Sequence, residues 1–81
     1  MVFRTLVKTG EIEVDGRSYA IHYFASTTPH GTQRYSGELA LGPNDLIIVD
    51  GSSLGDLEWR VARLMPATIY SRALAARAIA A

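Results

Sequence analysis

Apolar and polar residues alternate along the first part of the chain, and turn-forming residues interrupt this alternation at intervals. An Asp15-Gly16 pair separates the first two alternating segments. Asp-Gly is favoured in two-residue type I′ turns because both central residues need a positive φ angle. The pattern predicts a β-hairpin in which Ile12 lies opposite Tyr19, and Gly10 is expected to mark a bulge in the first strand.

The predicted register sorts the hairpin side chains into two faces. One face carries apolar and aromatic residues: Ile12, Val14, Tyr19, Ile21, Tyr23 and Ala25. The other face carries mainly polar residues: Glu11, Glu13, Ser18, Ala20 and His22. A slip of one residue would mix these two sets, so their separation supports the predicted pairing.

Two more strands are predicted after a polar loop at residues 26–32. Residues 33–41 alternate again, and a turn at 42–45 leads into an apolar run at 46–49. A short uninterrupted apolar run is typical of a strand buried on both faces. We therefore expect residues 46–49 to lie in the middle of the sheet, and the four segments together predict an antiparallel meander.

A helical segment is predicted to follow the strands. Ser53 and Asp56 have the spacing of a capping box, which marks a helix N-terminus. Apolar residues then recur at helical spacing and predict a stripe that faces the core: Leu54, Leu57, Val61, Leu64 and Met65. Pro66 is expected to kink or break the helix, with residues 66–81 continuing as helix beyond it. The predicted fold class is α+β: a four-stranded antiparallel meander followed by a C-terminal helical segment kinked or broken near Pro66.

Length and composition restrict this interpretation further. A chain of 81 residues is expected to form a single domain, residues 1–81, with a thin core, and self-association is a common source of extra stability at this size. The chain has no cysteine and a formal net charge of zero. These features predict no disulfide and give no overall reason for a nucleic-acid or membrane partner. We see no signal peptide or membrane-spanning run and expect a cytoplasmic protein.

Three patterns that suggest chemistry have simpler explanations. Gly51 to Gly55 match the G-x-S-x-G nucleophile elbow, but neither a histidine nor an acid follows Glu58 to complete a triad. A phosphate at the same turn would meet Asp50 and Asp56. His22 and His30 are two isolated histidines explained by a solvated strand position and by the 26–32 loop. We therefore expect no catalytic residue, cofactor or metal, and no enzymatic activity.

Trp59 is the most informative residue for function. It falls on the side of the predicted helix opposite the core stripe, with Arg63 beside it. If the helix continues through a kink, Tyr70 and Leu74 extend this outer line. Exposed tryptophan, tyrosine and arginine are typical of protein interfaces. The sequence predicts a small protein-interaction module that homodimerises through its C-terminal helical segment, unless residues 66–81 cover Trp59 within the same chain.

An alternative function is binding of single-stranded nucleic acid. Tyr19, Tyr23 and Tyr35 share one face of the predicted sheet, and aromatic side chains on a sheet can stack on unpaired bases. Arg72 and Arg77 would then contact the phosphates. The apolar neighbours on the same face favour a core covered by the helix instead.

Overall fold

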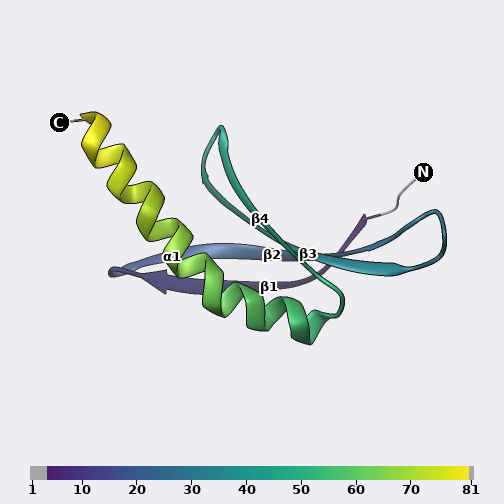
Figure 1. Cartoon of the computed structure of the whole chain (residues 1–81). Helices are drawn as coiled ribbons and strands as arrows, with labels where there is room; N and C mark the ends of the chain where they lie inside the picture. The colour runs from purple at the N-terminus through teal and green to yellow at the C-terminus, as the bar shows by residue number, and fades with distance from the viewer. Residues whose placement is uncertain (1–3, 81) are drawn as a thin grey trace.

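The computed structural model describes residues 4–80, and the side chains of residues 4–77, as one antiparallel sheet followed by one long helix (Figure 1). Its elements are β1 (Arg4–Val14), β2 (Arg17–Thr27), β3 (Gln33–Gly42), β4 (Asp45–Gly51) and α1 (Leu54–Ala80). The strands lie in the order β1-β2-β3-β4, as in a meander. The predicted α+β architecture is confirmed.

The β1–β2 hairpin has the predicted turn and pairing. Asp15 and Gly16 have φ angles of 56° and 81°. Both values lie in the left-handed region that a type I′ turn requires. Ile12 pairs with Tyr19, as the alternation predicted.

The bulge in β1 does not lie at Gly10, which pairs regularly with Ile21. The register shifts between Leu6 and Lys8 instead, so the prediction was wrong by three residues. The extra residue changes the phase of the strand. This change affects residues 4–6, which precede the shift, so Leu6 lies opposite Phe24. Lys8 keeps the hairpin register opposite Tyr23, and its ammonium lies on the helix side of the sheet, 3.0 Å from the Glu58 carboxylate of α1.

Strand β4 lies at the edge of the sheet, which corrects the prediction of a central strand buried on both faces. Ile47 is buried against α1, whereas Leu46 and Ile48 are about half exposed on the opposite face. Within residues 4–80 a single helix covers one face of the sheet, and the other face is left open. The apolar run at 46–49 therefore extends onto a solvent-facing surface.

Helix α1 runs without interruption through Pro66, so of the two predicted alternatives the break is not found, and a kink at this residue stays a prediction. Met65 and Ile69 lie on either side of the proline and are both buried against the sheet. Their burial holds the two adjoining turns in place despite the missing backbone N–H. Leu64 was predicted to face the core but is 52% exposed. The buried stripe instead advances four residues at a time, through Leu57, Val61, Met65 and Ile69.

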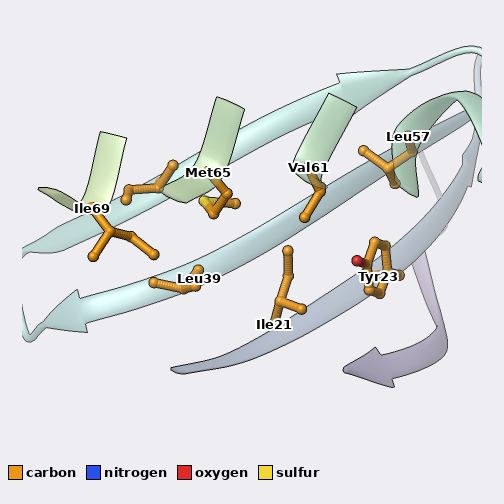
Figure 2. Packing of buried hydrophobic residues seen from close by; sticks show 8 residues of the cluster. Ile21, Tyr23, Leu39, Leu57, Val61, Met65 and Ile69 are labelled. Atoms are coloured by element: carbon orange, nitrogen blue, oxygen red, sulfur yellow. The ribbon is translucent and has the colours of Figure 1, made fainter. Parts of the chain in front are cut away.

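The core is one layer of side chains between α1 and the sheet, as Figure 2 shows. Its buried members are Ile21, Tyr23, Leu39, Ile47, Leu57, Val61, Met65 and Ile69. Gly51 allows the start of α1 to approach the end of β4 closely. A Cβ atom at this position would lie 2.9 Å from the Cα and N atoms of Leu57.

The predicted cap fixes where α1 begins. The backbone N–H of Asp56 donates to Ser53 Oγ at 3.1 Å, and the Asp56 carboxylate accepts the backbone N–H of Ser52 at 3.2 Å. The reciprocal bond thus comes from one residue earlier than in the standard capping box. It nevertheless satisfies two backbone donors at the junction with β4.

Candidate interaction surface

The outer side of α1 carries the four side chains that the sequence predicted for an interface, which we call the outer stripe: Trp59, Arg63, Tyr70 and Leu74. Trp59 is 60% exposed, and Tyr70 and Leu74 are about half exposed. The Arg63 guanidinium lies 4.8 Å from the centroid of the Trp59 ring. This distance is typical of a cation–π contact, which favours one orientation of the indole at the surface.

Trp59 is not covered by the C-terminal part of the chain within residues 4–80. Because α1 is continuous, residues 66–80 extend along the helix axis instead of folding back over the indole. The intramolecular alternative considered for Trp59 is therefore not found.

The outer stripe has a symmetrical spacing along the helix. Trp59 and Leu74 are equally far from the peptide bond that joins Pro66 to Ala67, and so are Arg63 and Tyr70. A two-fold axis through this midpoint would place each member of a pair opposite the other in an antiparallel copy. The spacing would therefore allow the outer stripe of one copy to face the outer stripe of an antiparallel second copy.

Two grooves run beneath the C-terminal half of α1. The first, about 280 Å³, lies between the helix and the β1–β2 turn, and its lining includes Val14, Asp15, Tyr19 and Ala73. The second, about 260 Å³, lies toward the β3–β4 side and is bordered by Asp45, which forms an ion pair with Arg72.

Neither groove was predicted from the sequence, although the sequence carried a signal of both. Among the described side chains of α1, Ile69 is the last that is buried, and Ala73 and Ala76 follow at core-facing spacing. Alanine is too short to reach the sheet from these positions. Figure 1 shows the C-terminal turns of α1 extending beyond the strands. Alanine at core-facing positions, where a helix usually presents large apolar side chains, thus indicated unfilled space between α1 and the sheet.

The sheet tyrosines lie on the helix-covered face and not on an open one. Tyr23 is only 6% exposed, and Tyr19 and Tyr35 are partly buried against the same core. Burial raises the pKa of the Tyr23 phenol, and the nearby Glu58 carboxylate raises it further, while Lys8 acts in the opposite direction. An unpaired base has no access to the Tyr23 ring in this arrangement, which weighs against the nucleic-acid alternative.

The predicted arginines of that alternative also lie elsewhere. Arg72 is engaged with Asp45, and Arg77 borders the first groove. On the open face of the sheet, Arg4 pairs with Glu38 and its guanidinium stacks 3.8 Å above the Phe24 ring centroid. The arginines are thus distributed over both sides of the molecule and do not line one groove.

The patterns that suggested chemistry are structural elements in this fold. Ser53 caps α1, and His30 lies in a loop closed by a backbone hydrogen bond of 2.8 Å from Thr28 N–H to the Thr32 carbonyl. In the part of the chain that the structure describes, no three histidine, aspartate or glutamate side chains come together as a metal site.

Comparison with known proteins identifies no relative of this chain. No family model matches the chain, and no curated protein or solved structure matches it either. Over residues 4–80, α1 included, no helix combines the length and the apolar character that crossing a membrane requires.

Proposed function

We propose that this chain is a non-enzymatic protein-interaction module that forms a homodimer through the outer stripe of α1. The observation that carries the proposal is the exposure of Trp59, the only tryptophan of the chain, on a helix face that no other described segment covers. Tryptophan, tyrosine and arginine are the residues most enriched among interface positions that dominate binding energy.

The spacing of the stripe specifies how two copies would meet. In an antiparallel arrangement centred on Pro66 and Ala67, Trp59 contacts Leu74 of the second copy, and Arg63 lies against Tyr70 of the second copy. The first contact is apolar and the second is a cation–π pair. Each occurs twice because a two-fold interface is reciprocal.

Burial of Trp59 supplies a large part of the expected stabilisation. A tryptophan side chain buries about 200 Å², so its exposed part removes about 120 Å² from water on association, worth about 3 kcal/mol for each copy as an upper bound. Self-association also compensates for a small core, which has eight buried hydrophobic residues among the described side chains.

Light scattering coupled to size exclusion tests the proposal. The full chain is expected to have the mass of a dimer in the micromolar range, and Trp59→Ala is expected to raise the dissociation constant more than about 30-fold, as for a hot-spot residue. Ile48→Ala is a matched control, because it removes an exposed apolar side chain from the open face of the sheet. A monomeric wild-type chain at high micromolar concentration would contradict the proposal.

A further inference from the structure

The outer stripe alone offers little surface for a stable dimer. Between Trp59 and Leu74 it spans about 22 Å, at a rise of 1.5 Å per residue. Specific interfaces bury about 800 Å² on each partner, and a strip of helix this short and one or two side chains wide buries less. A dimer formed through the stripe therefore needs additional surface beside it.

The first groove adjoins the stripe at its C-terminal end. Tyr70 belongs to the stripe and also lines the groove. Ala73 and Arg77, which line the groove as well, lie one residue before and three residues after Leu74. An antiparallel partner centred on Pro66 and Ala67 would bring its own tryptophan to this turn of the helix.

We infer that the first groove is the binding site for the Trp59 side chain of a second copy, an inference that rests on the proposed homodimer. The groove volume of about 280 Å³ fits an aromatic side chain, since a cavity of about 150 Å³ holds benzene. Val14, Tyr19 and Ala73 supply apolar or aromatic walls, and the Asp15 carboxylate at the turn can accept the indole N–H.

The inference assigns a role to the small residues of the distal helix. Ala73 leaves the gap between α1 and the hairpin unfilled within one copy, and the tryptophan of the other copy fills it. Because the arrangement is reciprocal, two indoles occupy two grooves. The contact surface then extends from the helix to the end of the β1–β2 hairpin, which gives the additional area that the stripe lacks.

Complementation between two variants tests this inference with the full chain. Ala73→Leu blocks the groove but keeps the tryptophan, and Trp59→Ala keeps the groove but removes the tryptophan. Each variant alone is expected to raise the dissociation constant at least tenfold. A mixture of the two can form a heterodimer with one intact tryptophan–groove contact, so the mixture is expected to associate more tightly than either variant alone. Ala75→Leu, an exposed position that lines neither groove, is the matched control and is expected to dimerise normally.

The fluorescence of the single tryptophan gives a second measurement that needs no substitution. The emission maximum of the wild-type chain is expected to shift to shorter wavelength as concentration rises through the dissociation constant, because the indole leaves water. Far-ultraviolet circular dichroism confirms that each variant is folded.

The possible results of these experiments distinguish a failure of the groove assignment from a failure of the proposed homodimer. A wild-type dimer in which Trp59 emission stays unchanged, or variants whose mixture associates no better than each alone, would overturn the groove assignment and leave dimerisation intact. A wild-type chain that stays monomeric at high micromolar concentration would overturn both.

Discussion

The two halves of α1 have similar helix-forming residues but meet the sheet differently. In the proximal half, Leu57, Val61 and Met65 are buried at four-residue intervals. In the distal half, every side chain from Tyr70 to Arg77 is exposed. The distal turns extend beyond the strands (Figure 1) and carry alanine at the positions that face the sheet, so both the end of the sheet and side-chain size account for the difference.

Forming a helix and packing that helix against the sheet depend on different properties of the side chains. Alanine is the strongest helix former, and it keeps the distal turns helical. It also contributes too little apolar area to hold them against the sheet. The distal half is therefore an extended element with free space beneath it, which is the kind of surface that a second copy can occupy.

Truncating one leucine in each half of α1 is the strongest test of this difference in burial. Leu57→Ala is expected to lower the free energy of unfolding by about 2–5 kcal/mol, because it leaves a cavity in the core. Leu74→Ala removes the same atoms from an exposed position and is expected to change monomer stability by less than about 0.5 kcal/mol. Urea denaturation at a protein concentration well below the dimer dissociation constant measures both, so the place of Leu74 in the proposed dimer interface does not contribute. Equal losses would show that the distal half is docked in solution.

A pair of glycine substitutions tests how closely the start of α1 packs against the end of β4. Gly51→Ala places a methyl group 2.9 Å from the Leu57 backbone, so we expect a loss of about 1–3 kcal/mol through overpacking. Gly55→Ala meets no atom within 4 Å apart from its chain neighbours and the nearby backbone of its own helix. It lies in the first turn of α1, so we expect a gain of about 0.5–1 kcal/mol. Thermal unfolding distinguishes the two signs. A neutral Gly51→Ala would indicate that α1 can shift away from β4.

The smallest expected effect concerns the pH dependence of the proximal helix start. The backbone N–H of Ser52 holds the pKa of the Asp56 carboxyl below its usual value, and Arg60 lowers it further, while desolvation has an opposing effect. Because the folded pKa is the lower one, the stabilisation is present above the unfolded pKa of about 4 and is lost as pH falls through the folded value.

Asp56→Asn tests this assignment. The variant is expected to lose part of the acid-induced decrease in stability seen with the wild-type chain, measured as the denaturation midpoint between pH 6 and pH 2. Asp50→Asn, at an exposed residue of β4, controls for the removal of one negative charge. An Asp56→Asn profile parallel to that of the wild type would contradict the role of the cap.

Local patterns predicted the parts of the fold that depend on neighbouring residues. The Asp15-Gly16 turn sets the register of β1 and β2, and the Ser53 cap sets the start of α1. The errors concern features that depend on the path of α1 over the sheet. Leu64 has core-like spacing from Leu57, seven residues earlier, but the buried stripe advances by four residues and leaves it outside. The edge position of β4 likewise depends on which face the helix covers.

The candidate site also has one part that local sequence predicted and one part that it did not. The exposure of Trp59 followed from the helical phase of its neighbours, because residues two apart project from different sides. The groove required knowledge of where the sheet ends beneath the helix. Pro66 was expected to kink or break the helix, but α1 is continuous through it, with Met65 and Ile69 buried on either side.

Pro66 has a further consequence for motion, because a proline ring carries no amide hydrogen. The carbonyl of Ala62, four residues earlier, therefore lacks its helical donor. The hydroxyl of Thr68 donates to the neighbouring Leu64 carbonyl at 2.9 Å and gives the backbone a local bond near this gap. With one link missing, we expect the distal turns to exchange their amide hydrogens with solvent faster than the proximal turns, which hydrogen-exchange mass spectrometry can measure.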